Sequence, residues 1–208
     1  MTEEKIQNLK DDIAFMRALA QEGSTVPLLF GGNMVAAGLI FGAGSIGHWL
    51  IESGTLIVPA WAYLVNWLGA GALFAVVCSV MIRRSRSRPG FSAGVNKATG
   101  SAWSGVGFAI FAMWLGIMAY GYRTQDWEVM NIFPVIIFGL YGAAWLVAGD
   151  MTGKGWIKLV ALGSFAGAVL MGFLSGTDHQ MLGYAACLFL LAVVPGLVLM
   201  RQEPSDTI

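Results

Sequence analysis

Two histidines and two carboxylates are the residues whose types and spacing could do chemistry. His48 and Glu52 lie four apart in "HWLIE", so a helix places them on one face, and Asp178 and His179 are adjacent in a later polar stretch. Imidazole and carboxylate groups are ligands for zinc and other divalent metals, which need three or four donors. The four residues could therefore form a metal or proton-sensing site if they converge. Alternatively, they are polar residues of turns at a membrane surface.

Little other chemistry is visible in the apolar segments. Asn66 is the most notable polar residue inside one, and we expect it to form a hydrogen bond between helices, with a ligand role as the alternative. No lysine lies in the middle of a segment to form a Schiff base, and no histidine pair lies there to bind haem. The sequence therefore predicts a protein that is not an enzyme and needs no cofactor, except for the divalent metal considered above.

The elements that position these residues are predicted to be transmembrane helices. The chain has 208 residues, of which 57% are hydrophobic and only 12% charged, whereas about a quarter of a soluble domain is charged. About 20 helical residues cross a bilayer core. Since alternating strand patterns are absent, we predict an all-α, polytopic membrane protein with three helical hairpins. The six expected spans are 27–51, 56–82, 103–122, 129–149, 156–175 and 181–200.

Glycine-rich motifs predict how these helices pack. "GLIFG" (38–42) and "GSFAG" (163–167) place small residues four apart, which lets helix backbones approach closely in lipid. The first span has the most glycines and is expected to be central. Pro195-Gly196 is expected to bend the last span. Trp67, Trp114 and Trp145 lie deep in the spans, where they either pack or line a cavity.

The distribution of positive charge predicts the orientation in the membrane. Of the 12 Lys and Arg residues, all except Arg123 fall in segments that share a side with the N-terminus. Positive residues concentrate on the cytoplasmic side, so we expect a bacterial inner-membrane protein with both termini, including the 201–208 tail, in the cytoplasm. The basic stretch "RRSRSRP" (83–89) should attract anionic lipid, and direct binding of nucleic acid is not expected.

Residues 1–26 differ from the rest and are predicted to form an amphipathic cytoplasmic helix with a short linker. Apolar residues alternate spacings of three and four, as in a two-helix seam, with a second apolar strip beside it. Because such a short helix is unstable alone in water, something must cover it. It could lie on the membrane surface, fold back on inner loops or pair with a second copy, or dock on a soluble protein. The expected contact residues are Ile6, Leu9, Ile13, Phe15, Met16 and Leu19.

The same stretch suggests a family and a function. "DIAFMRALAQEG", followed by "PLLFGG", resembles a group of small uncharacterised bacterial inner-membrane proteins. The resemblance implies six spans and a short cytoplasmic head, and it implies no activity. We therefore expect a membrane-anchored regulatory or sensory protein whose N-terminal helix docks a cytoplasmic partner, conceivably a transcription regulator. The alternatives are a small transporter or channel for an apolar or weakly polar solute, and a structural subunit of a larger membrane complex.

Overall fold

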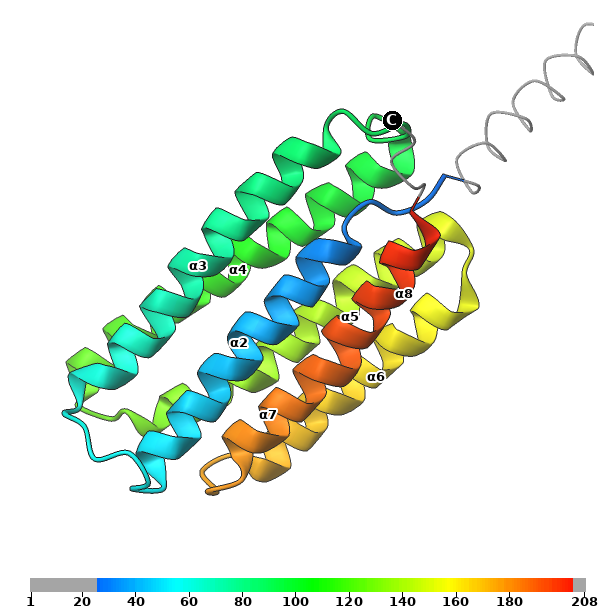
Figure 1. The fold of residues 1–208 in the computed structure, drawn as a ribbon. Helices are drawn as coiled ribbons and strands as arrows, with labels where there is room; N and C mark the ends of the chain where they lie inside the picture. The colour runs from blue at the N-terminus through cyan, green and yellow to red at the C-terminus, as the bar shows by residue number, and fades with distance from the viewer. Residues whose placement is uncertain (1–25, 204–208) are drawn as a thin grey trace, which may run out of the picture.

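The computed structural model describes residues 26–203, and within this range it contains helices and no strands (Figure 1). Six helical stretches are long and apolar enough to cross a membrane, as predicted. The predicted N-terminal amphipathic helix lies outside the described residues. The elements are α2 (Gly31–Glu52), α3 (Trp61–Ser85), α4 (Gly94–Thr124), the 3-10 turn η1 (Glu128–Ile132), α5 (Phe133–Thr152), α6 (Gly155–Leu174), α7 (Gln180–Leu188), the π-helical turn η2 (Phe189–Val193) and α8 (Val194–Gln202).

The helices form the three expected hairpins, α2–α3, α4–α5 and α6–α7. Neighbouring helices around the bundle follow the order α3, α2, α7–α8, α6, α5 and α4. Both ends of the described chain lie at the end of the bundle that carries the α3–α4 and α5–α6 connections (Figure 1). The turn between α5 and α6 is tight because Gly153 adopts a left-handed backbone with φ 66°.

Helix boundaries differ from the predicted spans mainly at α4. This helix begins at Gly94, nine residues before the expected start at 103, so the long basic loop shrinks to residues 86–93. Polar residues such as Asn96 lower the hydropathy of the first turns of α4 without preventing a helix. Conversely, residues 56–60 are apolar but precede α3, because Pro59 lies just before its first turn.

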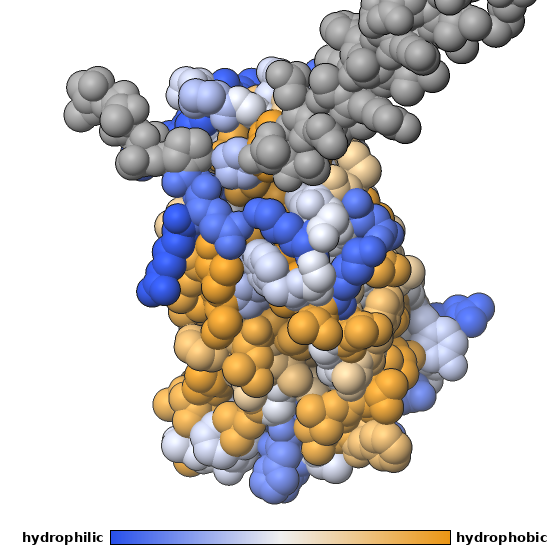
Figure 2. All heavy atoms as spheres, turned by 90° about the vertical axis from the view of Figure 1, so that its right-hand side faces the viewer, coloured by the Kyte–Doolittle hydropathy of each residue, from blue (hydrophilic) through white to orange (hydrophobic). Residues whose placement is uncertain are grey.

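The core lies between α2, α5, α6 and the last span. Phe138, Trp145, Ile157 and Met171 are each 0% exposed. The outer helices contribute less: in the most apolar stretch of each helix, 6% of α3 and 0% of α4 is buried, compared with 50% for the α5 span. Figure 2 shows hydrophobic residues over the middle of the molecule and hydrophilic ones towards its ends. These exposed apolar helices indicate contact with a lipid bilayer.

Small residues bring α2 close to the last span. A Cβ added to Gly31 would lie 2.7 Å from the carbonyl oxygen of Gly196, and one added to Gly38 would lie 2.4 Å from a methyl of Val193. Close backbone approach is what glycine allows in membrane bundles. In the "GLIFG" motif only Gly38 has this role, because an added Cβ at Gly42 would meet no atom within 4 Å.

The last span changes its helical pitch just before Pro195. Proline has no N–H, so it cannot donate to the carbonyl of Leu191 four residues earlier. The π-helical turn η2 spans this region, and the Nε1–H of Trp145 donates to the Leu191 oxygen at 3.2 Å. Trp145 of α5 therefore donates the hydrogen bond to the Leu191 carbonyl that Pro195, which has no N–H, cannot donate.

Candidate functional site

His48 pairs with a neighbouring helix at the end of the bundle opposite to the chain termini. The Nε1–H of Trp67, on α3, donates to Nδ1 of His48 at 3.0 Å. The ring of Tyr63 lies 4.7 Å from the imidazole, centroid to centroid. Because Nδ1 accepts a hydrogen bond, the imidazole is neutral with its proton on Nε2. This contact joins α2 to α3, and it leaves Nε2 as the nitrogen that could meet a further group.

The other residues of the predicted metal site are distributed around this end. Glu52 ends α2, and its carboxylate interacts electrostatically with Asp178 of the α6–α7 turn. His179 precedes the first residue of α7. Within residues 26–203, no three His, Cys, Asp or Glu side chains are grouped closely enough to hold a metal ion. The structure thus brings two carboxylates near each other and engages His48 with Trp67, while the metal or proton-sensing site stays a prediction.

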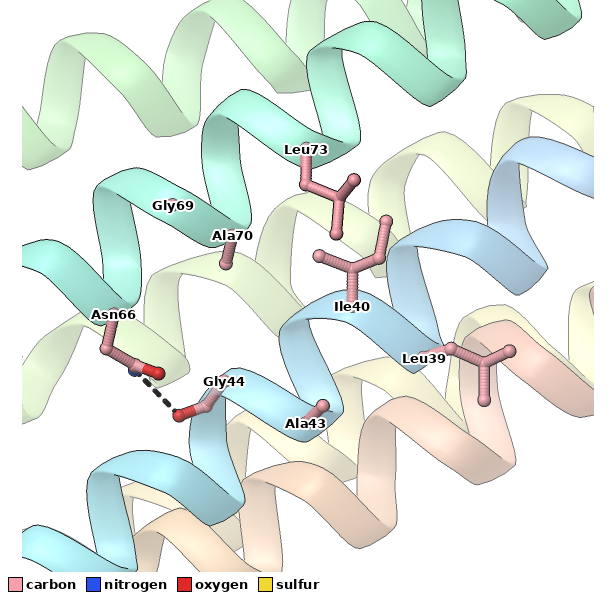
Figure 3. A pocket seen from close by; sticks show the side chains of 8 residues that line it. All are labelled: Leu39, Ile40, Ala43, Gly44, Asn66, Gly69, Ala70 and Leu73. Carbon is pink, nitrogen blue, oxygen red and sulfur yellow. Dashed lines mark hydrogen bonds between the residues drawn. The ribbon is translucent and has the colours of Figure 1, made fainter.

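Asn66 forms a hydrogen bond between helices, which is the arrangement expected for it. Its Nδ2 donates to the carbonyl of Gly44 at 2.8 Å. Its Oδ1 lies beside α2, 2.9 Å from where a Cβ of Gly47 would stand. Asn66 and Trp67 are adjacent, so consecutive side chains of α3 contact the C-terminal half of α2. Asn66 also lines a groove between α2 and α3 (Figure 3).

At the opposite end, Asn96 fixes the segment that enters α2. We call residues 26–30 the entry segment. The Oδ1 of Asn96 accepts from the backbone N–H of Leu29 at 3.1 Å, and its Nδ2 donates to the carbonyls of Pro27 and Gly90, each at 3.0 Å. Leu28 is 1% exposed. One side chain thus satisfies three backbone groups and links the entry segment to the α3–α4 loop.

Aromatic packing holds the entry segment as well. The ring of Phe30 lies 6.0 Å from that of Trp103 and 5.7 Å from that of Trp145, centroid to centroid. Trp103 in turn meets Tyr141 edge to face at 5.1 Å. The entry segment is therefore anchored to α4 and α5 together.

The C-terminal end of α8 is tied to the same end of the bundle. Arg88 of the α3–α4 loop forms an ion pair with Glu203. Lys154 of the α5–α6 turn donates to the Oε1 of Gln202 at 2.7 Å. The entry segment, both connections and the end of α8 are thus joined by polar contacts.

Sequence reasoning missed the role of Asn96, because it was assigned to a loop whose hydropathy hid the start of α4. It also missed the pairing of Trp67 with His48, which are 19 residues apart. The acceptor of Trp145 could have been anticipated, since Pro195 leaves the Leu191 carbonyl without its usual donor. The predicted partner-binding residues, which are Ile6, Leu9, Ile13, Phe15, Met16 and Leu19, lie outside the described residues.

Two shallow grooves lie on the sides of the bundle. One, between α2 and α3, has a volume of about 410 Å³ and is lined by residues that include Leu39, Gly44 and Leu73. The other lies between α6 and the last span, has a volume of about 400 Å³, and is lined by residues that include Gly163 and Leu191. None of the deep tryptophans lines either groove: Trp145 is in the core, and Trp114 stacks on Phe111 at 6.3 Å.

No protein-family model, curated protein or solved structure is significantly similar to this chain. The likeness of the N-terminal stretch to small bacterial inner-membrane proteins therefore stays a resemblance. What the protein does has to be argued from its own residues.

Proposed function

We propose that this chain is a membrane-anchored regulatory or sensory protein of the bacterial inner membrane, whose N-terminal helix docks a cytoplasmic protein. The observation that carries the proposal is the fixed entry segment. Leu28 is buried and Asn96 binds the backbone on both sides of it. The point at which residues 1–25 join the bundle is therefore fixed, as a presented docking helix requires.

The charge distribution supports the orientation that this function needs. Within the described residues, all Lys and Arg except Arg123 lie at the end that holds the entry segment. The carboxylates at that end are paired, Asp150 with Lys158 at 2.6 Å and Glu203 with Arg88. Concentrated positive charge favours the cytoplasmic side. The N-terminal helix would then face cytoplasmic proteins.

The transporter alternative is supported less well by the packing. A solute path would need space along the bundle, whereas Phe138, Trp145 and Met171 fill its centre with 0% exposure. The two grooves lie at the sides, between neighbouring helices. A structural subunit would suit the exposed α3 and α4, and it becomes an outcome of the test below.

The test is site-specific photocrosslinking of the full chain in its native membrane. A photoreactive amino acid replaces Leu9, on the predicted seam, and the matched control carries the same probe at Ala14, on the opposite side of the helix. We expect the Leu9 probe to attach to one soluble protein that the Ala14 probe does not reach. Ile13→Glu should abolish this product, because burying an unpaired carboxylate costs several kcal/mol, while the membrane yield of the protein stays the same.

Other products would contradict the proposal in distinct ways. A crosslink from Leu9 to residues 86–93 of the same chain would make the helix a strut of the bundle. A crosslink to a second copy would make it a dimer contact, and one to an integral membrane protein at constant ratio would favour the subunit alternative. Attachment to lipid would place the helix on the membrane surface.

A further inference from the structure

We propose that the groove between α2 and α3 binds one hydrocarbon chain of a membrane lipid. The inference rests on the proposed membrane placement of the bundle and is independent of any cytoplasmic partner. Figure 3 shows the groove with Asn66 at one end and Leu73 towards the other. The groove is open to the surface of the bundle, between α2 and α3, which contact each other along their length.

Small residues on both helices create the groove. Gly44 and Ala70 form the floor, where a Cβ added to Gly44 would lie 3.6 Å from the Cβ of Ala70. Leu39 and Leu73 stand at its sides and are 53% and 54% exposed. Because the floor side chains are short and those at the sides are long, a recess remains that the chain's own side chains leave empty.

The size and lining of the groove favour a hydrocarbon chain over a helix of a partner protein. Its volume is about 410 Å³. A helix about 10 Å across occupies roughly 420 Å³ in a single turn, so a partner helix could pack over the groove but could not fill it. No charged side chain lines it, and its polar lining is limited to Asn66 and backbone. A flexible, uncharged hydrocarbon chain fits both the volume and the lining.

The surroundings identify the source of that chain. More than half of the surface of Leu39 and of Leu73, which line the groove, is exposed, so the groove is continuous with the lipid-facing surface. Asn66 and Leu73 are five and twelve residues after the start of α3. At 1.5 Å per residue the groove covers depths of roughly 8–18 Å, which is largely within one leaflet of a core about 30 Å thick. Lipid of the leaflet on the α2–α3 turn side is therefore in position to fill it.

Asn66 marks the end of the groove that lies nearer the α2–α3 turn. Its Nδ2 donates across the helix pair to the carbonyl of Gly44 at 2.8 Å, and its Oδ1 lies next to Gly47. The amide therefore bridges α3 and α2, and its hydrogen bond keeps it from turning away. An acyl chain that passes Asn66 then runs along Gly44 and Ala70 towards Leu39 and Leu73. Packing against these residues, rather than a hydrophobic driving force, holds it there.

The experiment uses the full chain in phosphatidylcholine vesicles that contain a phosphatidylcholine with a photoreactive acyl chain. After illumination, labelled peptides are mapped by mass spectrometry. We expect labelling to be severalfold higher on 39–44 and 66–73 than on the exposed lipid-facing stretch 108–115 of α4. Gly69→Leu should reduce the groove labelling severalfold, because Gly69 lines the groove and an added Cβ meets no atom within 4 Å.

Gly71→Leu is the matched control, because Gly71 is on the same helix, has equally open space and does not line the groove. It should leave the labelling unchanged, and both variants should melt at the same temperature as the parent chain. Equal labelling of all lipid-facing stretches, or groove labelling that survives Gly69→Leu, would overturn the proposal. Crosslinked dimers through 39–44 would also overturn it, in favour of a second copy. If the chain fails to float with vesicles, the membrane placement itself is wrong.

Discussion

Three polar side chains inside the spans donate hydrogen bonds to partners on other helices. Asn66 donates to Gly44, Trp67 to His48 and Trp145 to Leu191. Leaving such groups unpaired in an apolar interior costs about 1–3 kcal/mol each. Among the buried side-chain nitrogen and oxygen atoms described, only Nε1 of Trp103 lacks a hydrogen-bond partner, and its ring meets those of Tyr141 and Trp145 edge to face. These pairs therefore fix which helix faces meet.

The Trp145–Leu191 hydrogen bond and Pro195 should be energetically coupled. Trp145→Phe removes the donor, and we expect a loss of about 1–3 kcal/mol in the free energy of unfolding in detergent. Pro195→Ala supplies a backbone N–H that can bond the Leu191 carbonyl, so Trp145→Phe should cost less in that background. A double-mutant cycle should give a coupling energy of about 0.5–1.5 kcal/mol. Additive effects would mean that the tryptophan acts through ring packing alone.

Asn96 should control the order of the entry segment. Asn96→Ala removes three hydrogen bonds to the backbone, and we expect faster amide hydrogen exchange at residues 28–30, with a loss of about 1–3 kcal/mol in stability. Asn96→Asp keeps an acceptor for Leu29 but turns a carboxylate oxygen towards the carbonyl oxygens of Pro27 and Gly90. Because these oxygens repel one another, it should loosen the segment at least as much as Asn96→Ala does. Unchanged exchange in Asn96→Ala would show that Leu28 and Phe30 hold the segment without it.

At the scale of elements, hydropathy predicts the number of spans and their pairing in hairpins, because length and apolarity are local properties. It misplaces the start of α4, where polar residues such as Asn96 and Lys97 belong to a helix. The site is predictable only in part. Asn66 was expected to bridge helices, whereas the Trp67–His48 pair depends on the relative rotation of α2 and α3, which periodicity alone does not give.

The two glycines of "GLIFG" should respond oppositely to an added methyl group. Gly38→Ala places a Cβ 2.4 Å from a Val193 methyl and 3.1 Å from the Leu188 carbonyl oxygen, so α2 must move from the last span. We expect a loss of about 1–3 kcal/mol in the free energy of unfolding. Gly42→Ala meets no atom within 4 Å and should be neutral or stabilise by up to about 1 kcal/mol through helix propensity. Chemical or thermal unfolding in the same detergent compares them. Equal losses would mean that α2 and the last span are less closely packed than described.

At the scale of the whole molecule, the two ends of the bundle differ in the charge of their side chains and in the polar contacts between their connections. The end with the entry segment gathers the basic residues and ties its connections together through Arg88–Glu203 and Lys154–Gln202. Among residues 26–203, the other end carries the carboxylates Glu52, Asp126, Glu128 and Asp178, and Arg123 is its single Lys or Arg. This charge asymmetry depends on the fold as well as on the sequence. The turns within the three hairpins all lie at one end of the bundle, and the connections between hairpins lie at the other.

The asymmetry predicts which end faces the cytoplasm. In a background with Cys78→Ser and Cys187→Ala, single cysteines replace Ser92 in the α3–α4 loop or Thr177 in the α6–α7 turn, both exposed. In intact cells an impermeant thiol reagent should label the cysteine at 177 and leave the one at 92 unlabelled, because basic connections are retained in the cytoplasm. Opening the cells should expose position 92 to the reagent, which controls for its reactivity. Labelling of position 92 in intact cells would reverse the orientation, place the N-terminal helix outside the cytoplasm, and remove the basis for a cytoplasmic partner.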